Sequence, residues 1–154
     1  MSRISKIAIC LVMGFFFFAC KKEKDFSIIP EIESRDFYLT SDSSALWVVG
    51  FTDGDGNIGI KSDEVGDPNF PYQVYTIENG QASLIEDTVN RGFRVPPIDG
   101  VETENGIEGE LQLSFTGLDL FKAFGIDSLY FSAYLIDRDG NQSNTLNTPI
   151  LSLN

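Results

Sequence analysis

The chain has 154 residues, a formal net charge of −12 and no histidine. Its excess of carboxylates repels nucleic acid, so we expect no nucleic-acid partner. Without histidine, Ser-His-Asp and Cys-His catalytic arrangements and histidine-based zinc sites are excluded. No glycine-rich loop precedes a helix in a way that would hold a phosphate. We therefore expect no enzymatic activity, with a carboxylate-based glycan hydrolase as a remote alternative.

The first nineteen residues have the pattern of a secretory signal peptide. Arg3 and Lys6 form a basic start, and a twelve-residue apolar stretch from Ile7 to Phe18 follows. This stretch is shorter than the roughly 20 apolar residues that a membrane-spanning helix needs. We therefore expect three parts: a signal peptide (1–19), a short tether that begins with Cys20 (20–25) and one folded domain (26–154).

The stretch "FFACKKEKD", Phe17 to Asp25, resembles a bacterial lipoprotein signal, in which a small residue precedes the cysteine that receives the lipid. The resemblance implies that Cys20 becomes the mature N-terminus and that acyl chains such as palmitate anchor the domain to a membrane. Phe17 departs from the Leu, Val or Ile usual in the family. Cleavage by ordinary signal peptidase is the competing interpretation, although that enzyme prefers a small residue where Phe17 stands.

The residues after Cys20 bear on where the protein is anchored. Lys21 stands where an Asp would favour retention in the inner membrane, so the general lipoprotein pattern favours the outer membrane. The run of Lys and acidic residues from Lys21 to Asp25 resembles the surface-export tags of Bacteroidota lipoproteins. We expect an outer-membrane location, and the sequence leaves both the periplasmic and the cell-surface face open.

From Phe26 onward, segments rich in β-formers alternate with turn signals. We expect strands at Ala45–Thr52, Tyr72–Ile77, Ala82–Ile85, Gly109–Phe115, Ser128–Ile136 and Ile150–Leu153. Asn79-Gly80 predicts a two-residue hairpin turn. One helical turn is expected, around Leu118 to Phe124. About seven short strands without alternating helices predict an all-β sandwich.

A second resemblance refines this fold. The stretch "SAYLIDRDGNQSNT", Ser132 to Thr145, resembles the penultimate-strand hairpin of bacterial immunoglobulin-like and fibronectin-type-III-like domains. Together with "FTDGDGNIG", Phe51 to Gly59, and the lipoprotein signal, it resembles small Ig-like lipoproteins of Bacteroidota. The resemblance implies an Ig-like sandwich in the cell envelope and implies no activity.

A D-x-D-G-N motif occurs twice, at Asp53 to Asn57 and at Asp137 to Asn141, each time after a hydrophobic strand. Oxygen-bearing side chains at alternating positions are the ligands that calcium collects. The helix-loop-helix calcium loop is excluded because its sixth position, which requires Gly, holds Ile58. Two interpretations stay open: a calcium site, or turns in which Asp and Asn bond nearby amides.

The expected topology brings the two motifs together. In an Ig-like sandwich, the loop after the second strand and the loop before the last strand lie at the same pole. We expect the following side chains to converge there: Asp53, Asp55, Asn57, Asp137, Asp139 and Asn141. Carboxylates in one place either repel one another or share a cation, so Ca²⁺ is the cofactor that this chain would hold.

Two Pro-rich segments, Asp67 to Gln73 and Arg91 to Gly100, suggest a weaker site. They carry Phe70, Tyr72, Arg91, Phe93 and Arg94. A binding surface of aromatic residues and arginines is one interpretation. Loops that pack over the open ends of the sandwich are the other.

These features together predict a lipid-anchored, non-catalytic binding or assembly module. Its partners would be the membrane, through the anchor, and an envelope protein or glycan that the sequence does not identify. The alternative is a purely structural spacer without a specific ligand.

Overall fold

The computed structural model describes residues 25–61, 63–86, 90–98 and 106–153. The expected signal peptide and Cys20 lie outside the described residues. Among the residues that are described, no helix is long and apolar enough to cross a bilayer.

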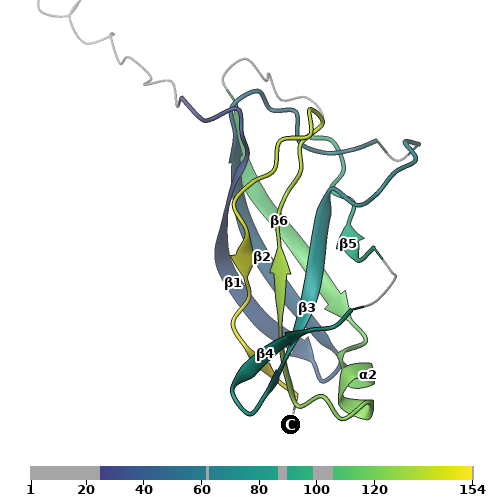
Figure 1. The fold of residues 1–154 in the computed structure, drawn as a ribbon. Coiled ribbons are helices and arrows are strands. Elements are labelled where there is room, and N and C mark those ends of the chain that lie inside the picture. Colours follow the sequence, from purple (N-terminus) through teal and green to yellow (C-terminus); the bar gives the residue numbers. More distant parts are fainter. Residues whose placement is uncertain (1–24, 62, 87–89, 99–105, 154) are drawn as a thin grey trace, which may run out of the picture.

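Two antiparallel sheets pack face to face (Figure 1). The first has the order β1-β2-β6, with bounds Glu31–Ser41, Ser44–Asp53 and Ile107–Thr116. The second has the order β4-β3-β7-β8, with bounds Gln81–Leu84, Phe70–Glu78, Ser128–Ala133 and Leu146–Asn147. Two short strands complete it: β5 (Gly92–Phe93) pairs with β3, and β9 (Leu151–Ser152) pairs with β7. The predicted all-β sandwich is confirmed.

Apolar and polar residues alternate along β6, whereas β2 is apolar along most of its length. In β6, Leu113 and Phe115 are buried, whereas Glu110, Gln112 and Ser114 are exposed, as predicted. β2 lies between β1 and β6 and is buried along most of its length, which explains its nearly continuous apolar run.

An aromatic cluster fills the space between the sheets. Trp47 of β2 is fully buried, and its ring meets Phe37 of β1 and Phe70 of β3 edge to face, with centroids 6.4 and 6.3 Å apart. Phe115 of β6 stacks on Phe131 of β7 at 4.0 Å. The indole N–H of Trp47 donates to Ser34 Oγ at 2.8 Å. Aromatic packing, much of it edge to face, thus surrounds Trp47 in the core.

The predicted turns are present. Glu78 pairs with Gln81 across Asn79-Gly80, and both turn residues have positive φ (51° and 78°), as a type I′ hairpin requires. Helix α2 (Leu118–Ala123) is the expected helical turn, and it buries Leu118.

Strand β1 was not predicted. Its sequence, EIESRDFYLTS, is largely polar, because β1 is an edge strand that exposes most of its residues, and only Ile32 is buried. Charges along an edge strand oppose pairing with another molecule. β5 and β8 were also missed, since two-residue strands carry no periodic signal. The predicted strand at Ser128–Ile136 ends earlier, at Ala133; beyond it, Ile136 N donates to Asn69 O at 2.8 Å and Ile136 forms an isolated bridge with Gln142.

The chain enters the sandwich at the pole where β2 ends. Gly54 N donates to Ser27 O at 2.7 Å, and β1 then runs away from this pole, pairing Glu31 with Thr52 and Ser41 with Ser44. The C-terminal strand β9 and helix α2 lie toward the opposite pole (Figure 1).

Candidate metal centre

The first D-x-D-G-N motif forms a tight turn around a buried carboxylate. Asp53 is the last residue of β2 and has no exposed surface. Its Oδ2 accepts the backbone N–H of Asn57 at 2.9 Å. Gly56, between them, has a φ of 65°, which favours glycine. Asp55 Oδ1 also accepts the Asn57 N–H, at 3.3 Å.

The second motif repeats this bond. Asp137, itself buried, accepts the Asn141 backbone N–H with Oδ1 at 2.8 Å, and Gly140 takes the positive φ of 85°. The two asparagine side chains form different hydrogen bonds. Asn141 Nδ2 bonds back to its own Asp137 at 2.7 Å, whereas Asn57 Nδ2 reaches Asp55 at 3.0 Å and Asp139 of the other turn at 3.1 Å.

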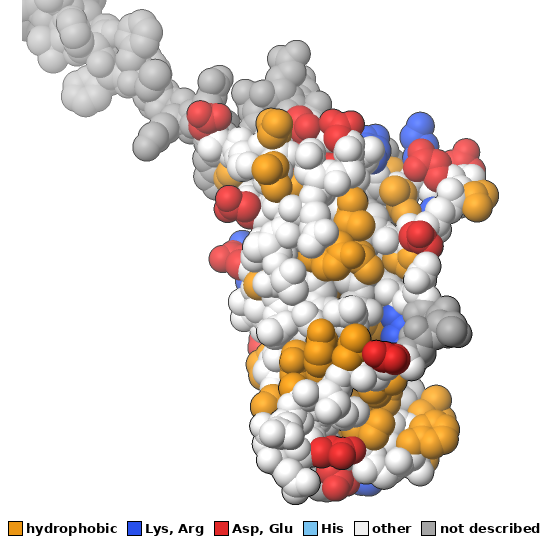
Figure 2. Space-filling view, viewed as in Figure 1, with side chains coloured by type: hydrophobic (Ala, Val, Ile, Leu, Met, Phe, Trp, Pro, Cys, Tyr) orange, Lys and Arg blue, Asp and Glu red, His pale blue; other side chains and the backbone are white. Residues whose placement is uncertain are grey.

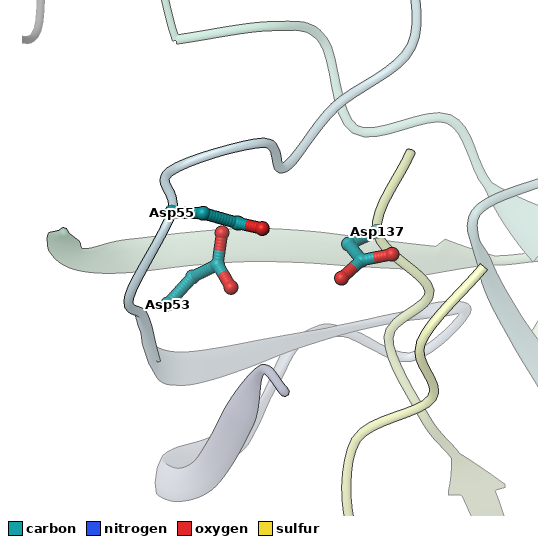
Figure 3. Close-up of side chains that lie close together, drawn as sticks. All are labelled: Asp53, Asp55 and Asp137. Carbon is teal, nitrogen blue, oxygen red and sulfur yellow. The ribbon is translucent and has the colours of Figure 1, made fainter. Parts of the chain in front are cut away.

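The two turns are bound to each other. Arg138 donates to Asn57 O from its backbone N–H at 3.3 Å and from Nε at 2.9 Å. As a result, Asp53, Asp55 and Asp137 point toward one another (Figure 3). One carboxylate oxygen from each lies within 4.8 Å of the other two. Asp139 is outside this group of three and contributes the bond to Asn57.

Two buried oxygens in this cluster have no hydrogen-bond partner among the described residues: Asp53 Oδ1 and Asn57 Oδ1. A buried acceptor without a partner costs about 1 to 3 kcal/mol, and more when it is charged. Burial, and then the charge of Asp55, raise the pKa of Asp53 from 3.8 to about 6, against the lowering effect of the Asn57 N–H. At neutral pH the protein therefore keeps a carboxylate charged where charge is disfavoured.

The arrangement has the chemistry of a hard-cation site. Three carboxylates converge, and the buried amide oxygen of Asn57, in the first turn, has no hydrogen-bond partner; both are ligand types that Ca²⁺ uses. The turn interpretation and the cation interpretation are compatible here: the backbone N–H groups of Asn57 and Asn141 orient the carboxylates, and Asp53 Oδ1 and Asn57 Oδ1 are left without a partner.

Asn144 links this pole to β1, a role that was not predicted from the sequence. Its side-chain amide accepts from Ile32 N at 2.9 Å and donates to Ile32 O at 2.8 Å, so it pairs with β1 as a strand residue would. No local sequence signal predicts this role, because it depends on a distant strand that the sequence analysis missed.

The structure does not gather the five residues of the predicted aromatic surface into one surface. Phe70 is fully buried, and Tyr72 and Phe93 stack against the core at 5.5 Å from each other. Arg94 secures the β2–β3 loop by donating to Gly66 O at 2.7 Å and to Glu64 O. Arg91 and one side of Tyr72 line a groove on the outer face of the second sheet. In the structure, the three aromatic residues pack in or against the core.

No family model matches this chain, and neither a curated protein nor a solved structure matches it.

Proposed function

We propose that the protein is a lipid-anchored outer-membrane lipoprotein that serves as a non-catalytic binding or assembly module, and that its two D-x-D-G-N turns share a calcium ion. The buried, unpartnered Asp53 Oδ1 carries the calcium part of the proposal. The stretch "FFACKKEKD" supports the lipid anchor.

The cluster has reason to hold a cation because no ion pair to its three carboxylates is present among the described residues. Asp53 is surrounded by Asp55 and Asp137, and the one arginine of the turns, Arg138, donates to a backbone carbonyl instead of to these carboxylates. Like charges at such separations repel strongly in a poorly solvated site. A divalent ion would offset this repulsion and supply the missing partner of Asp53 Oδ1.

The donor set favours calcium over other metals. All candidate ligands are oxygens, whereas zinc and copper prefer nitrogen and sulfur donors. Magnesium demands near-ideal octahedral geometry, whereas calcium accepts irregular sets of six to eight oxygens. Asp53, Asp55, Asn57 and Asp137 offer at least four, and water would complete the shell. Extracellular modules bind calcium with dissociation constants of about 10⁻⁴ to 10⁻³ M, which suits an exported protein.

Direct calcium binding tests this part of the proposal. Full-length protein in detergent is stripped with chelator and titrated with CaCl₂ and, separately, with MgCl₂ by calorimetry. We expect one calcium per chain, weaker magnesium binding, and loss of calcium binding in Asp137→Asn. Asp42→Asn, at the opposite end of β2, removes the same charge and should bind as the unaltered protein does. Absence of binding at millimolar calcium, or unchanged binding in Asp137→Asn, would refute the calcium site.

The anchor is tested separately. Cells that express the full chain are labelled with an alkyne analogue of palmitate and then fractionated. We expect label on the protein and recovery in the outer-membrane fraction, and both should be lost in Cys20→Ser. Label that persists in Cys20→Ser would refute lipidation at this residue. A protein that is lipidated, yet binds neither calcium nor any envelope component, would be the structural spacer.

A further inference from the structure

Exposed apolar side chains gather at the pole where the chain enters the domain. Ile28 and Ile29 are adjacent and are 63% and 50% exposed, and Val65, in the loop between β2 and β3, is fully exposed. The entering chain and this loop lie at the same end of the molecule (Figure 1), and Figure 2 shows hydrophobic side chains exposed there among acidic ones. Single apolar residues on a surface are ordinary, but several at one end of a domain indicate a contact.

The backbone holds Ile28 and Ile29 in a fixed bend. Ser27 Oγ accepts the N–H of Ile29 at 3.0 Å, and Ser27 O accepts the N–H of Gly54 at 2.7 Å. Pro30, which follows the two isoleucines, is buried. The bend is therefore fastened on both sides, while its two apolar side chains remain exposed to solvent.

Val65 is presented in a similar way. Arg94 donates to Glu64 O at 2.6 Å and to Gly66 O at 2.7 Å, on either side of Val65. These bonds hold the backbone of the loop, so the loop is ordered before any ligand binds. An apolar side chain at the tip of an ordered loop loses little conformational freedom when a surface covers it.

Exposure alone does not distinguish this pole, because Leu120 of α2 is 60% exposed toward the opposite pole. The two poles differ in their distance from the proposed lipid anchor. Ile28 follows Cys20 by eight residues, a reach of at most about 28 Å. β2 runs the length of the first sheet, and its ten residues add about 33 Å between the poles. A lipid on Cys20 thus keeps Ile28 near the bilayer, where tethering makes even weak contacts populated.

Other occupants fit this pole less well. Asp63 and Glu64 precede Val65, and Asp25 and Glu31 flank the bend, and all four are exposed. These charges repel the same pole of a second copy of the chain. They also need water, so the pole can rest in the interfacial layer of a bilayer but cannot enter the hydrocarbon core.

We infer that this pole rests on the bilayer surface, with Ile28, Ile29 and Val65 inserted among the lipid headgroups. The inference rests on the proposed lipid anchor and adds to it a direct contact between the folded domain and the membrane. The contact holds the sandwich upright, with α2 at the end away from the bilayer, instead of leaving the domain to swing on its tether. It does not depend on the calcium ion.

The test uses full-length, lipidated protein reconstituted alone in vesicles of phosphatidylcholine and phosphatidylethanolamine. Ile28→Cys and Val65→Cys variants carry a bimane label, and lipids with a nitroxide on the headgroup quench any label that touches the bilayer surface. Leu120→Cys, whose position is about as exposed as that of Ile28, is the matched control. The unaltered protein, treated with the same label, is the blank. We expect quenching at positions 28 and 65 to be about threefold stronger than at position 120, or more.

A charge placed in the bend tests the apolar side chains themselves. Ile29→Asp, combined with the label at position 65, should weaken the quenching by about twofold or more, because a carboxylate resists transfer out of water. Ile150→Asp, which alters an exposed isoleucine just before β9, should leave the quenching unchanged. The melting temperature of each variant shows that it is folded.

Equal quenching at positions 28 and 120 in folded, lipidated protein would overturn the inference, as would quenching that Ile29→Asp leaves intact. Labels whose emission shifts to the blue without quenching would lie against another copy of the chain, which would overturn it too. Mass spectrometry of each sample shows whether Cys20 carries the lipid. Lipidated protein that is not quenched refutes this inference alone, whereas protein without lipid refutes the anchor on which it rests.

Discussion

Replacing Asp53 by Asn should raise the stability of the protein when calcium is absent. When calcium is present, the variant should be less stable than the unaltered protein. The substitution keeps the shape of the side chain and an oxygen that can accept the Asn57 N–H, which lies 2.9 Å from Asp53 Oδ2. It removes one negative charge from the group of three carboxylates. It also replaces one carboxylate oxygen, and so a metal ligand, by an amide N–H₂ that can donate to Asp55 or Asp137.

Without metal, the Asn variant should be the more stable protein. The pKa of Asp53 is raised from 3.8 to about 6 by burial and by Asp55, so the ionised side chain destabilises the fold at pH 7. After allowance for solvent screening, the cost is on the order of 1 kcal/mol. For a domain of this size, that corresponds to a melting temperature about 3 to 5 °C higher than that of the unaltered protein in chelator.

With calcium, the order should invert. A ligand at about 100 times its dissociation constant stabilises the folded state by about 2.7 kcal/mol. The unaltered protein should therefore gain about 10 °C near 10 mM calcium. Asp53→Asn should gain little, because it lacks the carboxylate at the centre of the site.

Thermal melts of full-length protein by circular dichroism, in chelator and in calcium, measure all four values. Asp42→Asn serves as the control, since its carboxylate is exposed in the turn between β1 and β2. Two outcomes would refute the reasoning: a variant that melts below the unaltered protein in chelator, or a calcium shift that survives the substitution.

Further predictions concern pH and two partly buried hydrogen bonds. Because the pKa of Asp53 in the folded protein lies above its ordinary value, metal-free protein should become less stable as pH rises from about 4 through about 6. Calcium affinity should fall as pH drops below about 6, because the carboxylate becomes protonated. Thermal melts in chelator and in calcium measure both effects. Ser34→Ala leaves the Trp47 indole N–H without its partner and should cost about 1 to 3 kcal/mol in urea unfolding, whereas Ser34→Thr should cost less. Asn144→Asp should destabilise more than Asn144→Ala in the same assay, since its carboxylate would face the Ile32 carbonyl that the amide now binds.

The parts of the fold that the sequence predicts are those whose signal is local. β6 and the Asn79-Gly80 turn follow from alternation and from turn chemistry, because each residue responds to its immediate surroundings. β1 escapes prediction for a physical reason. β6 is also an edge strand, but it buries three residues, whereas β1 buries only Ile32, so the composition of β1 is governed by solvent and by protection of the edge instead of by the core.

The candidate site divides in the same way. The turn bonds of Asp53 and Asp137 lie within five residues, and the repeated motif predicts them. The convergence of the two turns followed from the expected topology. The topology did not predict which carboxylates face one another. Asp139 lies outside the group of three, although it occupies the same motif position as Asp55. The two turns also differ in their contacts, since Arg138 of the second turn donates to the Asn57 carbonyl of the first.

The chain enters the domain beside the proposed calcium site, so a calcium ion there could resist force transmitted from the membrane anchor. Gly54 lies within the first turn, and its N–H binds Ser27 O. A Cβ at this position would lie 2.4 Å from Phe26 O, so the turn and the entering chain fit only with glycine there. Five residues, 21–25, separate Phe26 from Cys20, a span of at most about 17 Å. If Cys20 carries the lipid, any pull on the anchor reaches the fold at this turn. A cation shared by Asp53, Asp55 and Asp137 would join the end of β2 to the loop after β7, and so spread that load over both sheets.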